Sequence, residues 1–192
     1  MTGAARPGPP AALGLPEPPL VDRAAGIVLR PWAPTPGDVA ALVAAWRDPA
    51  LSHSAGVPDD VSAAAAERWI RGEPARRAAG LCLDLVVGPL GGDAVAGEVG
   101  LRNIDRVRRR AEMSWWIAAE HRERGRASAA ARLLAGWALA PGGGDLVQVW
   151  ARTDPADRGS AAVAAAAGFD ELGEAAGTTV WARTRRPADP SD

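Results

Sequence analysis

The chain has 192 residues, enough for one domain with a sizeable core. Its net charge of −1 argues against a strongly basic surface of the kind that binds nucleic acid. It lacks the roughly 18 continuous apolar residues of a membrane-spanning helix, so neither nucleic acid nor a membrane is an expected partner. The single cysteine, Cys82, excludes an internal disulfide and is typical of a reducing compartment, so we expect a cytoplasmic protein.

One folded domain is expected between two tails. Residues 1–20 are rich in proline and contain no run of large apolar residues behind a basic start. They are therefore expected to be a disordered tail and not a signal peptide. The domain should cover residues 21–185, and residues 186–192 should form a second disordered tail.

Apolar periodicity and turn residues predict seven strands and four helices. The predicted strands cover residues 26–30, 81–87, 94–101, 111–117, 146–151, 169–172 and 178–183. The predicted helices cover residues 36–46, 60–72, 125–140 and 160–167. The third helix lies between the fourth and fifth strands, which predicts a βαβ unit with parallel strands inside a mixed α+β fold.

The turn between the fourth strand and the third helix carries the strongest functional signal. Arg122 to Ala127 has the pattern R-x-x-G-x-A and leads directly into the helix. A helix start has unpaired N–H groups and a partial positive charge, which suit a phosphate. Gly125 leaves the backbone open to close approach, and Arg122, Arg124 and Arg126 add positive charge. The segment predicts a phosphate-binding turn; the alternative is a basic surface loop that caps the helix.

Three blocks of sequence together resemble the GNAT acyltransferase superfamily, and most closely its ribosomal-protein-alanine N-acetyltransferase-like branch. They are LRPW at 29–32, AEMSWWIAAEHRERGRA at 111–127 and DPADRGSAAVAAAAGF at 154–169. The middle block is the most specific, because its turn lies between the expected strand and helix with the last block downstream. The resemblance implies a GNAT-like three-layer α+β fold. Its central mixed, mostly antiparallel sheet would have about seven strands, flanked by about four helices.

The resemblance also implies acetyl-CoA as cosubstrate and no metal. In the family the turn binds the pyrophosphate, and the pantetheine arm pairs with the fourth strand where it splays from the fifth. Ser128 would add a hydroxyl donor. Asp157 stands where the family usually has asparagine, which places a carboxylate near the cofactor arm. The implied cofactor site comprises Trp116, Ile117, Ala118, Ala119, Arg122, Arg124, Gly125, Arg126, Ala127, Ser128 and Asp157.

Acyl transfer to an amine requires a base, because free amines are largely protonated near neutral pH. Glu112 is the first candidate, since it alternates with Ser114 on one face of the fourth strand. An ion pair of Glu112 with Arg109 or Arg110 explains this residue equally well. Glu98 on the third strand is the second candidate.

The leaving thiolate needs a proton donor, and the residue that many members of the family use for this is missing from the sequence. Many members of the family use a tyrosine, and this chain has none. Ser160 resembles a position thought to contact the CoA sulfur, which makes it the second catalytic candidate. It would serve equally as the N-cap of the alanine-rich helix.

The sequence thus predicts an acetyl-CoA-dependent N-acetyltransferase that acts by direct attack of an amine in a ternary complex. The chain contains no recognisable activated nucleophile, so no covalent enzyme intermediate is expected. The acceptor is a protein N-terminus or a small amine, and a homodimer is left open. An acyl-CoA-binding regulatory module without turnover is the alternative. A different nucleotide-binding protein is a third reading, but the Walker lysine and the three-glycine dinucleotide turn are both missing.

Overall fold

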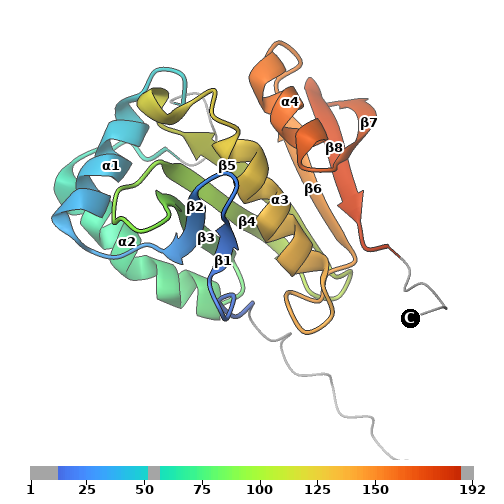
Figure 1. Cartoon of the computed structure of the whole chain (residues 1–192), viewed down its shortest axis with the longest axis horizontal. Helices are drawn as coiled ribbons and strands as arrows, with labels where there is room; N and C mark the ends of the chain where they lie inside the picture. The colour runs from blue at the N-terminus through green and yellow to red at the C-terminus, as the bar shows by residue number, and fades with distance from the viewer. Residues whose placement is uncertain (1–12, 52–56, 187–192) are drawn as a thin grey trace, which may run out of the picture.

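The computed structural model describes residues 13–51 and 57–186, in which one sheet of eight strands is flanked by four α-helices (Figure 1). The strands are β1 (Leu20–Asp22), β2 (Ile27–Pro31), β3 (Cys82–Pro89), β4 (Gly97–Asp105), β5 (Arg110–Ile117), β6 (Gln148–Thr153), β7 (Asp170–Ala175) and β8 (Thr178–Thr184). The helices are α1 (Pro36–Arg47), α2 (Ala63–Ala78), α3 (Arg126–Leu139) and α4 (Arg158–Ala166), with a short 3₁₀ helix η1 (Ala119–His121).

The strand order is β1-β2-β3-β4-β5-β6-β8-β7, and every neighbouring pair is antiparallel except β5 and β6. The expected mixed, mostly antiparallel sheet is therefore confirmed. β1 is additional to the seven predicted strands, because three residues are too few to show a strand period. The core also includes residues before Val21, where the sequence analysis started the domain: Leu13 is buried, and β1 begins at Leu20. None of the described helices is long and apolar enough to cross a membrane.

The helices cover the two faces of the sheet in pairs. α3 and α4 pack on one face, around a core that includes Leu134, Val149 and Phe169. α1 and α2 pack on the other face, where Trp32 and Ile70 belong to a second core. Figure 1 shows α1 and α2 on one side of α3, and α4 with β6, β7 and β8 on its other side. Because β5 and β6 are parallel, their carboxyl ends and the starts of α3 and α4 that follow them lie at the same edge of the sheet.

A buried ion pair attaches α1 to the end of β2. Thr35 caps the helix by accepting from the Asp38 N–H at 3.2 Å, and Pro36 occupies the first helical position, which its fixed φ suits. Arg30 donates to both oxygens of Asp38 at 2.8 Å, and the Ala33 N–H donates at 3.0 Å. Burial acts to raise the pKa of Asp38, but these donors outweigh it and hold the pKa below its usual value. α1 is thereby fixed over the second face.

Gly97 allows β4 and β5 to approach closely at the end of the pair. A Cβ there would overlap the carbonyl oxygen of Trp116 and would lie 2.7 Å from Cδ1 of Ile117. Gly136 in α3 is different, because a Cβ there would meet nothing within 4 Å. A side chain is therefore excluded at Gly97 and tolerated at Gly136.

The first prediction compares these two glycines. Gly97→Ala should lower the free energy of unfolding by about 1–3 kcal/mol, because the added methyl group forces the two strands apart. Gly136→Ala should leave it unchanged or raise it by up to about 1 kcal/mol, since alanine is the better helix former. Urea denaturation followed by circular dichroism measures both. A Gly97→Ala protein as stable as the wild type would contradict the packing described here.

Candidate functional site

β5 and β6 diverge in the middle of the sheet. They pair only at Arg110↔Gln148, Ala111↔Val149 and Glu112↔Trp150. β5 remains paired with β4 as far as its last residue, and β6 with β8 as far as its own. None of the described strands therefore pairs with the edge of β5 from 113 to 117 on the β6 side.

The turn after β5 has two residues in the left-handed region of backbone space. Glu123 has φ +59° and Gly125 has φ +69°, and α3 begins at Arg126. Glycine adopts this conformation without the strain that other residues carry. Among the described residues, a Cβ on Gly125 would meet nothing within 4 Å, so they leave the space above the glycine open.

α3 is the one α-helix of the described chain whose first turn has no side-chain cap. Thr35, Ser62 and Asp157 cap α1, α2 and α4, whereas Gly125 precedes α3. The first helical hydrogen bond of α3 runs from the Ala129 N–H to the Gly125 carbonyl at 3.0 Å. The N–H groups of residues 126, 127 and 128 therefore have no partner within the helix. Together with the helix dipole these groups suit an anion, and the phosphate-binding role of Arg126, Ala127 and Ser128 stays a prediction.

The three arginines of the turn have different surroundings. Arg122 donates to Asp48 Oδ2 at 2.6 Å and to the Ile117 carbonyl at 2.9 Å, so its guanidinium connects the turn to the end of α1. Arg126 contacts Nδ1 of His121 at 3.0 Å. Arg124 is exposed. All three are predicted from the sequence to lie against the phosphate, but the ion pair with Asp48 gives Arg122 a partner within the protein.

Backbone groups after β5 are partly occupied. The Ala118 N–H donates to the Ala96 carbonyl at 2.9 Å, and the Ala119 carbonyl accepts from the Arg122 N–H at 3.3 Å. The cofactor-binding stretch predicted from the sequence, 116–119, therefore overlaps the unpaired edge of β5 only at Trp116 and Ile117. The edge itself begins three residues earlier, at 113.

Glu112 is buried in a cluster of donors, with 2% of its surface exposed. Arg102 lies 3.2 Å from one carboxylate oxygen, and Asn103 and Arg152 lie 2.6 Å and 3.4 Å from the other. Burial alone would raise its pKa, but these cations and hydrogen bonds hold the pKa of Glu112 below its usual value. The ion pair weighed in the sequence analysis is present, but its partners are Arg102 and Arg152. This environment disfavours proton acceptance by Glu112.

Glu98 has the opposite environment on the same face of the sheet. Its carboxylate accepts from the indole N–H of Trp32 at 2.8 Å and lies beside Trp116, its partner in the β4–β5 register. Burial, and then the negative charge of Asp84, raise the pKa of Glu98 to about 8, although hydrogen bonds from the two tryptophans act to lower it. Asp84 has room on this face because its register partner on β4 is Gly100, which has no side chain. Asp84 Oδ1 lies 2.8 Å from the position that a Cβ on Gly100 would take. A carboxyl group with this pKa is suited to proton transfer near neutral pH.

Asp157 and Ser160 meet at the start of α4. Asp157 is the N-cap and accepts from the Ser160 N–H at 2.9 Å. Burial acts to raise the pKa of Asp157, and hydrogen bonds from the side chain and backbone of Ser160 lower it below its usual value. The alternative reading of Ser160 as N-cap is wrong, because Asp157 takes that position and Ser160 lies in the first turn.

Cys82 and the grouping of the acidic side chains bear on two other kinds of chemistry. Cys82 is buried, and burial raises the pKa of its thiol to about 12, which makes it a poor nucleophile. Within residues 13–51 and 57–186, no three or more histidine, cysteine, aspartate or glutamate side chains are grouped to hold a metal ion.

The model of the acetyltransferase (GNAT) domain family matches residues 27–170. The chain belongs to this family. The resemblance drawn from the sequence is confirmed, and the protein is a GNAT acetyltransferase. Comparison with curated proteins gives no match.

Solved structures share the fold of this GNAT chain at low sequence identity. Mycobacterium smegmatis RimJ in complex with CoA-disulfide is 24% identical with a TM-score of 0.69, over 94% of this chain and 90% of its own. A ribosomal-protein-S5-alanine acetyltransferase from Vibrio fischeri is 17% identical with a TM-score of 0.70, over 86% and 96%. The microcin C7 self-immunity acetyltransferase MccE, solved with acetyl-CoA and AMP, is 18% identical with a TM-score of 0.68, over 83% and 92%.

The second prediction concerns the start of α3. Gly125→Asp should weaken acetyl-CoA binding about tenfold or more, because it adds negative charge beside the unpaired N–H groups. Gly142→Asp is the matched control, since Gly142 also has a positive φ, +79°, with nothing within 4 Å of a Cβ. It follows the other end of α3, about 20 Å from Gly125 at 1.5 Å per helical residue. Isothermal titration calorimetry measures both affinities. Equal affinities for the two folded variants would contradict the phosphate site.

The third prediction uses the raised pKa of Glu98. The pKa of Glu98 is higher in the folded protein than in the unfolded chain, so the folded state favours the protonated carboxyl group. The free energy of unfolding is therefore highest below about pH 4.5 and falls as the pH rises toward 8. The glutamine of Glu98→Gln cannot ionise, so the variant does not lose this stability at high pH. Its amide oxygen can still accept from the indole N–H of Trp32. The melting temperature of Glu98→Gln relative to wild type should therefore be higher at pH 8.5 than at pH 5. A difference independent of pH would show that Glu98 titrates normally.

Proposed function

We propose that this GNAT protein transfers an acetyl group from acetyl-CoA to a primary amine by direct attack. The gap between β5 and β6, which opens beside the uncapped start of α3, is the observation that carries the proposal. A diphosphate at this helix start and an extended arm along β5 would direct a thioester into the gap.

The proposed cofactor contacts follow from the unpaired backbone groups. The N–H groups of Arg126, Ala127 and Ser128 would hold the pyrophosphate, with Arg124 adding charge from the exposed part of the turn. The arm would pair with the edge of β5 between 113 and 117, as an added strand does. Backbone N–H groups of this edge would also stabilise the oxyanion that forms when the amine attacks.

Glu98 is our proposed base, in place of Glu112. The attacking amine loses a proton as the bond to the acyl carbon forms, and a carboxylate with a raised pKa accepts it more readily than one held by two arginines. Trp32 positions the Glu98 carboxylate through its indole N–H. Glu112 then maintains the structure between β4, β5 and β6. Ser160 is proposed as a hydrogen-bond donor to the leaving thiolate after its hydroxyl turns from Asp157.

The acceptor is a protein N-terminus or a small-molecule amine. Two of the neighbours in fold are described as RimJ and as a ribosomal-protein-S5-alanine acetyltransferase, which supports the first of these for this chain. A module that binds acetyl-CoA without turnover is the competing proposal, and it predicts binding without release of the CoA thiol.

The fourth prediction separates the two glutamates by kinetics. Glu98→Gln should lower kcat about 100-fold or more, with little change in KM for acetyl-CoA, because general base catalysis is removed. Glu112→Gln should keep kcat within about threefold in its folded fraction, while its stability falls because the buried carboxylate that pairs with Arg102 and Arg152 is lost. Release of the CoA thiol under saturating acceptor measures kcat.

The pH profile provides the control for this assignment. In the wild type kcat should rise with pH to a plateau above about 8, where Glu98 is deprotonated, and this rise should flatten in Glu98→Gln. A large loss of kcat in Glu112→Gln with no loss in Glu98→Gln would reverse the assignment. Acetyl-CoA binding without turnover for any amine would favour the regulatory module.

A further inference from the structure

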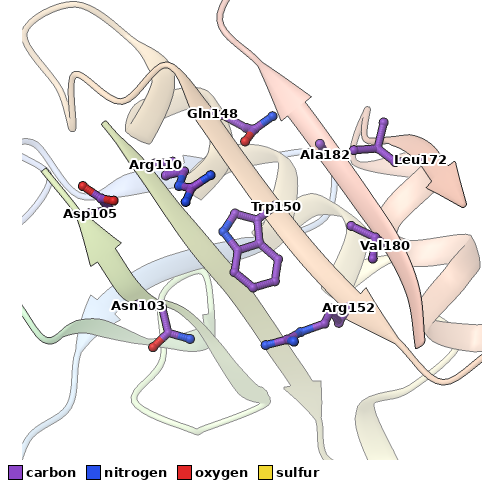
Figure 2. Close-up of a pocket in the computed structure, with 9 residues that line it drawn as sticks. All are labelled: Asn103, Asp105, Arg110, Gln148, Trp150, Arg152, Leu172, Val180 and Ala182. Atoms are coloured by element: carbon purple, nitrogen blue, oxygen red, sulfur yellow. The ribbon is translucent and has the colours of Figure 1, made fainter. Parts of the chain in front are cut away.

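A cavity of about 480 Å³ lies on the open face of β5, β6 and β8 (Figure 2). Along β6 the side chains alternate, so Val149 and Ala151 belong to the core beneath α3 and α4, while Trp150 and Arg152 line the cavity on the other face. Glu98 and Trp116 are on this same face, by the register of β4 with β5 and of β5 with β6. The volume is within the usual range for small-molecule and peptide-segment sites.

The charges around the cavity favour an anionic ligand. Arg110 and Arg152 line it directly, and Figure 2 shows both guanidinium groups on the cavity side of the strands. The lining carboxylate, Asp105, already accepts from the backbone and side chain of Arg108 at 2.8 Å and 3.0 Å. Glu112 beneath is satisfied by Arg102, Asn103 and Arg152. Four arginines therefore surround two carboxylates, and both carboxylates already have partners. The net charge around the cavity is positive; the arginines are Arg102, Arg108, Arg110 and Arg152.

The same cavity has an apolar part. The guanidinium carbon of Arg152 lies 4.8 Å from the centroid of the Trp150 ring, which holds the ring with one face toward the charge. Val180 and Ala182 on β8 line the neighbouring side, together with Leu172, which is 63% exposed. An apolar group of a ligand would remove this exposed surface from water.

The cavity lies next to the gap between β5 and β6 along the strands. Trp150 is opposite Glu112 at the last paired position, and the unpaired edge begins at the next residue. Counting about 3.3 Å per strand residue, Arg110 lies about 13 Å from Ser114 and about 20 Å from Trp116 along β5. A ligand whose amine is in the gap would therefore reach Arg110 only if it extends over several residues.

We propose that this cavity binds an extended peptide N-terminus with an acidic side chain at its fifth or sixth residue, about 13–17 Å from the amine at about 3.3 Å per residue. The inference rests on the proposed function, because the amine must lie at the gap for this spacing to apply. Arg110 pairs with the acidic side chain, and Trp150 with Val180 contacts an apolar side chain between the acid and the amine. The cavity thus selects among protein N-termini by charge and position.

Matched heptapeptide amides test the proposal. Each has an alanine N-terminus and carries one aspartate at position 2, 3, 5 or 6, and a second set carries asparagine at the same positions. For the wild type, kcat/KM should be about tenfold or more higher for aspartate than for asparagine at position 5 or 6, because a hydrogen-bonded charge pair is formed. At position 2, about 3 Å from the amine, the two should be equal within about twofold.

Two variants identify the residue responsible. Arg110→Gln should reduce the aspartate preference below about twofold while leaving KM for acetyl-CoA unchanged. Arg23→Gln is the matched control, since Arg23 is also an exposed arginine but lies between β1 and β2, at the far edge of the sheet. It should keep the full preference. Equal rates for aspartate and asparagine peptides in the wild type, or a preference that survives in Arg110→Gln, would overturn the inference.

Calorimetry with the same peptides, in the presence of CoA, separates this inference from the proposed function. Acetylation of benzylamine but of none of the peptides overturns the peptide site and leaves the transferase standing. Tighter binding of the aspartate peptides without acetylation of any amine supports the site and overturns the transferase. If the peptides neither bind nor react, the peptide site fails regardless of activity toward small amines.

Discussion

The divergence of β5 and β6 is the constraint on which the rest of the site depends. Neighbouring strands normally satisfy one another's backbone groups, and here that pairing ends after three positions in the middle of the sheet. Each strand is held by its outer neighbour, β5 by β4 and β6 by β8, so both persist without the missing ladder. The resulting edge is open to an extended ligand, and α3 begins at the same end of β5 with its first N–H groups unpaired.

The two glutamates on the shared face illustrate how local surroundings give one residue type two behaviours. Both are desolvated, which by itself raises the pKa of a carboxyl group. Glu112 is opposite Arg102 and receives three donors, so its pKa falls. Glu98 receives indole hydrogen bonds only and is close to Asp84, so its pKa rises to about 8. The charge of the neighbours decides which carboxylate accepts a proton near neutral pH.

Most of the fold was predictable because it depends on local patterns. The R-x-x-G-x-A turn predicted the start of α3 within one residue, and the βαβ order predicted the parallel strands. α2 was predicted to end at Gly72 but continues to Ala78 through Pro74. Contacts within the helix support this extension: Arg76 stacks on Trp69 at 4.4 Å, and Arg77 pairs with Glu73 at 3.1 Å. Packing there overrides the local stop signals.

The sequence by itself determined the family, the mixed sheet and the open helix start, because each follows from residues that are neighbours along the chain. Only the tertiary structure decided the partners of the charged side chains. Arg122 meets Asp48 from 74 residues away, and Glu112 meets Arg152 from 40 residues away. Electrostatic energy depends on distance in space and on burial, neither of which is encoded in spacing along one strand. The choice between Glu98 and Glu112 therefore required the assembled sheet.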